Sequence, residues 1–244
     1  MNRPMRHDGR RADQLRPVKI TPGFVGKADG SCLIEMGQTR VICTASLTAG
    51  VPDWLRGKGR GWLTAEYGML PASCGGRKSR PTLKPDGRAV EIQRLVGRSL
   101  RSAVALDRLG ENTLYLDCDV LEGDGGTRTA SITGSYVALA LALHSAARKG
   151  KCAANALSGA VAAVSVGIVG GRALLDLDYP EDSAAEVDMN VVMTGDGKLI
   201  DVQASAERGA FDSAQLQTML ALAGKGIAKL LPAQRRAIQE GMAS

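Results

Sequence analysis

The sequence is poor in the residues on which several common kinds of site depend. Aromatic residues make up 3% of its 244 residues, which disfavours a nucleic-acid reader that stacks bases on an aromatic platform. The two histidines, His7 and His144, lie far apart and fall in no ligand or triad pattern. Metal sites built on histidine and a serine–histidine–aspartate triad are therefore disfavoured.

Cysteine pairs and long apolar runs are also missing. The five cysteines are odd in number and none are spaced as C-x-x-C, which is typical of a reducing compartment, where each is a small buried apolar residue. The charged N-terminal segment lacks the apolar core of a signal peptide. No apolar run approaches the roughly 18 residues that a membrane span requires. These features predict a cytoplasmic protein with no membrane partner.

The composition bounds the size of the fold and the kind of partner. With 244 residues, 44% of them apolar, the chain can bury a substantial core, and we expect one domain over residues 1–244, with halves of roughly 1–150 and 151–244. The formal net charge is +6. Such a balance suits a polyanion such as nucleic acid, although a merely soluble basic protein is about as compatible with it.

Hydrophobic periodicity predicts strands followed by helices, twice over. In the first half we expect strands over 17–24, 31–36, 40–48, 61–69 and 113–121, and helices over 88–109 and 128–148. In the second half we expect hairpins of 160–169 with 172–179 and of 186–194 with 198–205, then two helices starting near Asp212 and Pro232. This order predicts an α+β domain of two related βα halves, in which mixed sheets pack against helices.

The sharpest local signal is Gly125-Gly126-Thr127-Arg128-Thr129, between a predicted strand and a predicted helix. Glycines let the backbone approach an anion, and the free N–H groups and dipole of the following helix attract it. The threonine hydroxyls and the Arg128 guanidinium add donors suited to phosphate oxygens. No Walker A sequence is present. An ordinary glycine turn with a threonine cap is the alternative interpretation.

A second cationic element opens the helix expected over 88–109. Arg88 follows Gly87 at its N-terminal end, where a second contact to an anion is geometrically reasonable. Three further arginines follow at helical spacing, for which a solvated charged face is the commoner explanation: Arg94, Arg98 and Arg101.

An acidic cluster lies in the second half: Asp176, Asp178, Glu181, Asp182, Glu186 and Asp188. If 186–191 is a strand, its alternation puts Glu186, Asp188 and Asn190 on one face. Carboxylates beside a phosphate repel it unless a cation lies between them, and Mg²⁺ held by one or two carboxylates is the usual solution. A solvated strand edge is the alternative. A site of carboxylates and arginines suits phosphoryl transfer.

Several segments together resemble those of the ribonuclease PH family. They are RHDGRRADQLRPV, GWLTAEYGMLP, the GR-x-x-EIQRL run, LDCDVLEGDGGTRTASITG and EDSAAEVDMNVVMT, and the resemblance extends from about residue 6 to the last helices. It implies a phosphorolytic 3′→5′ exoribonuclease that removes nucleotides following the CCA end of tRNA precursors, with inorganic phosphate as co-substrate. It also implies the reverse extension from nucleoside diphosphates and a homo-oligomer, a hexameric ring built as a trimer of dimers.

The resemblance also implies roles for particular residues. Arg88, Gly126, Thr127 and Arg128 correspond to the family's phosphate site, and Asp182 and Asp188 to its catalytic and Mg²⁺-binding positions. Arg77, Lys78 and Arg80 fall where the family grips the tRNA body. The family usually continues V-Q-G-T-A-E where this chain has VQASAE at 202–207. Two other functions stay open: a catalytically silent RNA-binding subunit, which should have lost the phosphate arginines or the acidic pair, and a hydrolytic nuclease.

Overall fold

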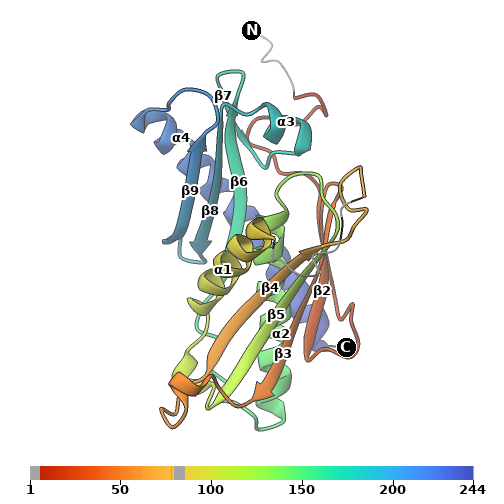
Figure 1. The fold of residues 1–244 in the computed structure, drawn as a ribbon, viewed down its shortest axis with the longest axis vertical. Helices are drawn as coiled ribbons and strands as arrows, with labels where there is room; N and C mark the ends of the chain where they lie inside the picture. The colour runs from red at the N-terminus through yellow and green to blue at the C-terminus, as the bar shows by residue number, and fades with distance from the viewer. Residues whose placement is uncertain (1–5, 78, 80–85, 244) are drawn as a thin grey trace.

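Two β-sheets, one from each half of the chain, form the framework of the protein (Figure 1). The computed structural model describes residues 6–77, 79 and 86–243. The first sheet has the strand order β1-β2-β3-β5-β4, in which β4 and β5 are parallel and the other neighbours antiparallel. Its strands are β1 (Val18–Pro22), β2 (Gly30–Met36), β3 (Thr39–Ala49), β4 (Trp62–Met69) and β5 (Asn112–Glu122).

The second sheet has the order β7-β6-β8-β9, and each neighbouring pair is antiparallel. Its strands are β6 (Val161–Val169), β7 (Arg172–Leu175), β8 (Val187–Thr194) and β9 (Leu199–Ala206). The β6–β7 turn consists of Gly170 and Gly171, both with positive φ, which is the geometry of the predicted two-residue hairpin loop. Both predicted hairpins of the second half are confirmed.

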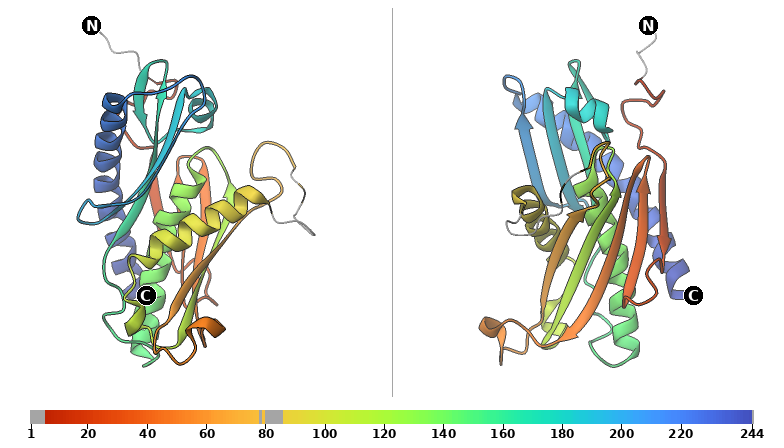
Figure 2. Two further views of the ribbon diagram at one scale, coloured as in Figure 1. Left: turned by 60° about the vertical axis from the view of Figure 1, so that its left-hand side comes forward. Right: turned by 45° about the vertical axis from the view of Figure 1, so that its right-hand side comes forward.

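Helices lie between and beside the sheets (Figure 2). Helix α2 (Thr127–Arg148) packs against β2 and β3 of the first sheet and β6 of the second, while α1 (Gly87–Arg101) covers β4. Helix α4 (Ser213–Ala243) contacts α2, β6 and β1, so it also reaches both sheets. The short α3 (Tyr179–Ala184) joins β7 to β8, and two 3-10 turns are η1 (Asp53–Leu55) and η2 (Leu106–Arg108). The fold is therefore α+β, with two sheets packed against shared helices.

Helix α2 forms the centre of the core. Seventeen of its 22 residues are buried, as a helix that is apolar on all sides requires. By length and composition alone it could cross a membrane, but 83% of its most apolar stretch is buried inside the molecule. Gly134 permits close packing on the first sheet, because a Cβ there would lie 2.7 Å from Cys43 Sγ. Packing between two sheets therefore explains its composition.

The helix expected over 88–109 is wrong in its second part, because α1 ends at Arg101. The backbone that follows pairs with a distant segment instead. The N–H of Ala105 donates to the carbonyl of Ala156 over 2.8 Å, and Val104 forms a bridge with Leu157. Val104 is buried by this pairing rather than by a helical stripe. Tertiary contacts here override the local helical pattern.

The expectation of two C-terminal helices is also wrong, because α4 continues through Pro232. Proline lacks the N–H that a helix interior uses and normally breaks it. Packing holds the turns on either side: Leu230 and Ala237 are buried. Between them, Nε2 of the buried Gln234 donates to a carbonyl of α2 and a carbonyl of β6, at 2.9 and 3.0 Å. These contacts keep the helix continuous.

The strand expected over 172–179 ends at Leu175, and the unpredicted helix α3 follows. Asp176 has a φ of 55°, outside the strand region, so the chain turns there. Asp178 then caps α3 through a capping box with Glu181, and Pro180 lies in the first turn. This D-x-x-E signature with an early proline was readable in the sequence as a helix start.

Candidate active site

A cleft of about 450 Å³ lies where the starts of α1 and α2 face the second sheet. The first half of the chain lines it with Arg88, Gly126, Thr127 and Arg128, and the second half with Asp182, Ser183, Ala185, Asp188, Asn190, Glu207 and Arg208. The six residues predicted for phosphate and acidic chemistry therefore share one cleft. Two predicted phosphate-site arginines on one side face two predicted acids on the other.

The turn between β5 and α2 is shaped for close approach to an anion. Gly125 and Gly126 have φ values of 74° and 66°, and a Cβ on Gly125 would lie 2.6 Å from the carbonyl oxygen of Leu177. Gly126 is the N-cap of α2, and no side chain caps the helix. Among the described residues, no side chain accepts from the first N–H groups of α2, and the helix dipole adds positive potential at this position.

Arg88 and Arg128 bring two guanidinium groups to this cleft. The backbone N–H of Arg88 donates to Asp86, the N-cap of α1, over 3.1 Å, and its guanidinium has no ion pair within the described part of the chain. Nη1 of Arg128 lies 3.4 Å from Oε1 of both Glu91 and Gln203, which are long contacts. Both side chains can therefore offer planar donors to a bound phosphate.

The two threonines of the glycine motif behave differently. The hydroxyl of Thr127 hydrogen-bonds to that of Tyr67 over 2.9 Å, and Thr127 lines the cleft. The hydroxyl of Thr129 donates to the carbonyl of Gly126 over 2.9 Å, and Thr129 is 1% exposed. The expectation that Thr129 offers its hydroxyl to an anion is therefore wrong. Its hydroxyl stabilises the turn instead.

The acidic wall comes from α3 and β8. Asp182 lies on α3, whereas Asp188 and Asn190 share one face of β8, as the alternation predicts. Nδ2 of Asn190 donates to Oδ2 of Asp188 over 3.3 Å, while Oδ1 is buried with no hydrogen-bond partner among the described residues. Glu186 departs from the prediction: it does not line the cleft, and it accepts from the N–H of Gly171 over 3.2 Å.

Burial shifts both aspartates toward their protonated forms. It raises the pKa of Asp188 to about 6, with a further contribution from the charge of Asp182, while Arg128 and the Asn190 hydrogen bond oppose the shift. Burial also raises the pKa of Asp182, against the effect of Arg88 and Arg128. Two carboxylates that repel each other in a half-buried site favour a proton or a cation between them.

Five lining residues were not predicted as site residues: Ser183, Ala185, Asn190, Glu207 and Arg208. Glu207 raises the pKa of both aspartates by its charge. It reaches the cleft because β9 pairs with β8, which brings the Glu207 N–H to 2.9 Å from the carbonyl of Glu186. The hairpin of these two strands was predicted from the sequence, but the register that places Glu207 in the cleft was not.

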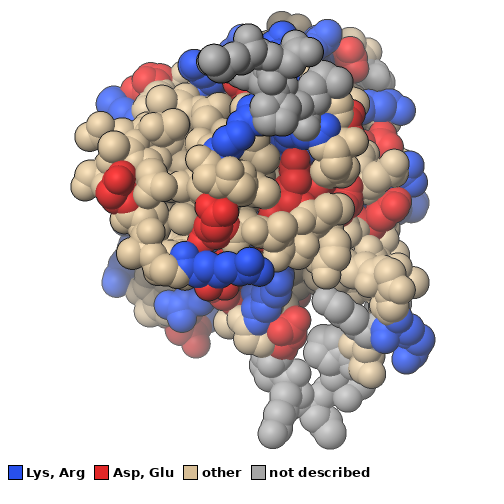
Figure 3. All heavy atoms as spheres, turned by 90° about the horizontal axis from the view of Figure 1, so that it is seen from above, with Lys and Arg blue, Asp and Glu red and all other residues tan. Residues whose placement is uncertain are grey.

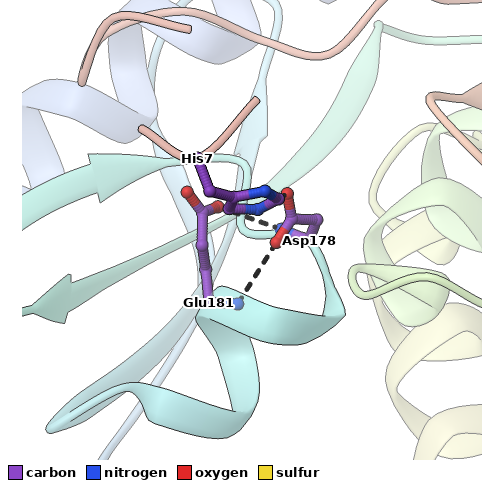
Figure 4. A group of neighbouring side chains, drawn as sticks. All are labelled: His7, Asp178 and Glu181. Carbon is purple, nitrogen blue, oxygen red and sulfur yellow. Dashed lines mark hydrogen bonds and ion pairs between the residues drawn. The ribbon is translucent and has the colours of Figure 1, made fainter. Parts of the chain in front are cut away.

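Three other acids of the predicted cluster, Asp176, Asp178 and Glu181, belong to a buried ion network. Figure 4 shows His7 beside Asp178 and Glu181, close enough together to hold a metal ion. Nε2 of His7 lies 2.8 Å from Asp178. However, Arg6 donates to Glu181 over 2.6 Å, and Nη2 of Arg10 lies 3.1 Å from Asp178. Arginines already neutralise these carboxylates, so the group is structural.

Of the residues predicted to grip RNA, the structure describes only Arg77, which is not among the residues that line the cleft. Arg77 is exposed, while Lys78 and Arg80 fall outside the described residues. On the end of the molecule seen in Figure 3, basic and acidic side chains lie side by side. On this face the described residues do not gather the net positive charge into one patch.

Comparison with known families accounts for most of the chain. Residues 14–143 match domain 1 of the 3′ exoribonuclease family named RNase PH, and residues 159–226 match domain 2. The first match ends inside α2, and the second begins just before β6. Every residue that lines the cleft lies within one of the two matched segments.

Solved structures with a similar fold include chains from exosomes and a rice protein. A chain of the Archaeoglobus fulgidus exosome with RNA bound to the active site is 25% identical with a TM-score of 0.78, covering 93% of this chain and 92% of that one. Rice (Oryza sativa) Rrp46 is 20% identical with a TM-score of 0.76, and the match covers 96% of this chain and 100% of that one. An archaeal exosome core chain is 24% identical with a TM-score of 0.70, and the match covers 98% of this chain and 91% of that one.

Proposed function

The chain belongs to the RNase PH family of 3′ exoribonucleases, and from this premise we propose that it removes nucleotides from RNA 3′ ends by phosphorolysis. The observation that supports this proposal is the composition of the cleft. Arg88, Arg128 and the glycine turn line one side of it, and Asp182 and Asp188 line the other. Cations and free N–H groups on one side suit an attacking phosphate. Acids on the other suit the metal and proton chemistry of the scissile bond.

In this mechanism an oxygen of inorganic phosphate attacks the phosphorus of the last phosphodiester. Arg88, Arg128 and the first N–H groups of α2 hold the phosphate and offset its charge. The bond from phosphorus to the 3′ oxygen of the preceding nucleotide breaks as the new bond forms. The products are a nucleoside diphosphate and an RNA shorter by one nucleotide, and the reverse reaction extends RNA from nucleoside diphosphates.

The acidic wall fits a magnesium ion. Oδ1 of Asp188 is buried without a partner among the described residues, and Asp182 lies near enough to raise the pKa of Asp188 by its charge. A carboxylate oxygen of this kind is the ligand that Mg²⁺ prefers. Asp188 would hold the ion, and a bound Mg²⁺ would neutralise charge on the scissile phosphate.

The leaving 3′ oxygen requires a proton, which Asp182 is suited to supply. Burial raises its pKa, and a carboxyl with a raised pKa holds its proton more readily and can act as a general acid. The pKa of Asp188 is raised as well, but a carboxylate that holds a metal ion must be ionised, so Asp188 would carry the charge when the ion is bound. This division of labour follows from the orphaned oxygen lying on Asp188 rather than on Asp182.

The proposed substrates are tRNA precursors, trimmed beyond the CCA end, and other RNA 3′ ends, in the cytoplasm. The sequence blocks shared with ribonuclease PH support this choice, and the similar Archaeoglobus fulgidus chain belongs to an exosome with RNA at its active site. We also propose a homohexameric ring, a trimer of dimers. Light scattering of the purified protein tests the assembly.

Retention of the site residues disfavours a silent RNA-binding subunit. Such a chain needs neither phosphate-binding arginines nor an acidic pair, whereas Arg88, Arg128, Asp182 and Asp188 converge here on one cleft. The test is to incubate a labelled RNA with and without inorganic phosphate. Phosphorolysis requires phosphate and releases nucleoside diphosphates. Release of monophosphates without phosphate would show hydrolysis, and no release would favour the silent subunit.

A further inference from the structure

One buried arginine joins the two halves of the chain directly behind the cleft. Arg16 is 5% exposed. Its backbone N–H donates to Oδ2 of Asp176 over 2.7 Å, and Nη2 of its guanidinium donates to Oδ1 over 2.6 Å. Asp176 follows β7 in the second half and is fully buried. Neither residue lines the cleft.

The same guanidinium holds the backbone of the glycine turn. Nη1 of Arg16 donates to the carbonyl of Asp124, and Nη2 lies 3.4 Å from the carbonyl oxygen of Gly125. A Cβ on Gly126 would lie 3.0 Å from Nη2, so the guanidinium packs against the turn itself. Oγ1 of Thr39 donates to the Gly125 carbonyl over 2.7 Å and assists from the first sheet.

Holding these two carbonyls fixes the direction of two N–H groups. A trans peptide is planar, with its N–H opposite its carbonyl. When the carbonyls of Asp124 and Gly125 point to Arg16, the N–H groups of Gly125 and Gly126 point away from it. Neither N–H has a hydrogen-bond partner within the described chain. They are therefore free to donate to an anion at the start of α2.

We propose that Arg16, anchored by Asp176, is a positioning residue for the attacking phosphate. It does not bind phosphate; it sets the orientation of the turn that does, and it ties that turn to the half of the chain that carries Asp182 and Asp188. This inference rests on the proposed phosphorolytic function. It adds a residue on which phosphate affinity depends although it lies outside the cleft.

An arginine is required at this position for a geometric reason. The carboxylate of Asp176 and the carbonyls of the turn lie on different sides of one group, and the planar guanidinium spans them with a fixed fork of donors. A lysine carries the same charge on a single nitrogen. Arg16→Lys therefore distinguishes two effects on phosphate binding. The positive charge near the site remains, but the planar set of donors that orients the glycine turn is lost.

Arg6 supplies a matched control within the same buried network. Its side chain is 2% exposed and donates to Glu181 and to the backbone carbonyls of Leu175 and Asp176, but not to the Asp176 carboxylate that holds Arg16. Among the described contacts, it makes none to the glycine turn. Arg6→Lys should therefore cost folding stability in the way that Arg16→Lys does, without moving the N–H groups of Gly125 and Gly126.

The experiment measures the KM for phosphate, kcat, RNA affinity and thermal unfolding in Arg16→Lys, Asp176→Asn and Arg6→Lys. We expect Arg16→Lys and Asp176→Asn to raise the phosphate KM on the order of tenfold to a hundredfold, with RNA affinity within about twofold of wild type. The double variant should be no worse than the more severe single one, because both break one clamp. Arg6→Lys should leave the phosphate KM unchanged, even if it lowers the melting temperature as much as Arg16→Lys does.

Two results would overturn the proposal. An unchanged phosphate KM in Arg16→Lys would show that its charge suffices or that the turn holds its shape alone. An equal rise in Arg6→Lys would show general loosening of the network. A wild-type enzyme that releases nucleotides without any phosphate requirement would instead reject the proposed function, so the two failures are distinguishable.

Discussion

The amide of Asn190 donates to one carboxylate oxygen of Asp188 over 3.3 Å, and the other oxygen is buried without a partner among the described residues. Burial raises the pKa of Asp188 to about 6, although the Asn190 hydrogen bond opposes the shift, and the unpartnered oxygen fits a metal ligand. Asp188→Asn should reduce turnover at least about a hundredfold, as loss of a metal ligand or its charge does. Turnover near that of wild type across a magnesium series would place the metal role elsewhere.

The same substitution should not weaken the fold. The pKa of Asp188 is raised from 3.8 to about 6, so its ionised form destabilises the folded state above the unfolded pKa. That cost grows as pH rises from about 4 to about 6 and amounts at most to about 3 kcal/mol. Asp188→Asn should therefore melt at or above the wild-type temperature at pH 7.5 and equal to it near pH 3. Thermal scans at both pH values without magnesium check this.

Activity should also fall on the acid side as Asp188 gains a proton. The rate at limiting substrate should decline as pH drops through about 6. Because Mg²⁺ favours the ionised carboxylate, raising its concentration should move this limb to lower pH. Rates at two magnesium concentrations over pH 5–8 provide the measurement. If the pH of this acid limb did not depend on the magnesium concentration, Asp188 would not be a ligand of the metal.

Arg88→Ala and Arg128→Ala should each weaken phosphate binding. Loss of one charge-assisted contact corresponds to about a tenfold to hundredfold higher KM for phosphate, while RNA binding stays largely intact. Arg98→Ala is the matched control, since Arg98 lies on the same helix as Arg88 but pairs with Asp201 outside the cleft lining. An exposed pair of this kind contributes little. Unchanged phosphate dependence in Arg128→Ala would sink the assignment.

The basic segment that contains Arg77, Lys78 and Arg80 is proposed to hold the tRNA body. Contacts to the phosphate backbone make affinity fall steeply with salt and carry no base information. Changing all three to Ala should weaken binding of a tRNA precursor and flatten its salt dependence, while a short single-stranded RNA is trimmed as before. Equal losses on both substrates would place these cations at the active site or in assembly.

The sequence predicted most strands, α2 and six cleft residues because each rests on local pattern or on a contiguous motif. Where prediction failed, distant contacts decide. Residues 103–105 pair with 156–158 and end α1 early, and packing around Gln234 carries α4 through Pro232. The hairpin of β8 and β9 was predicted, but the register that brings Glu207 into the cleft was not. Thr129 was expected to offer its hydroxyl to an anion, but the hydroxyl donates to the Gly126 carbonyl, and residue type alone does not determine that direction.

The central claim is that inorganic phosphate is the attacking group in the cleft between Arg128 and Asp188. The most direct measurement supplies radiolabelled inorganic phosphate with unlabelled RNA and magnesium, then separates the released nucleotides. Our account predicts label in the β-phosphate of nucleoside diphosphates, at one label per nucleotide removed, and its loss in Arg128→Ala at limiting phosphate. Unlabelled nucleoside monophosphates, released at the same rate with or without phosphate, would contradict it.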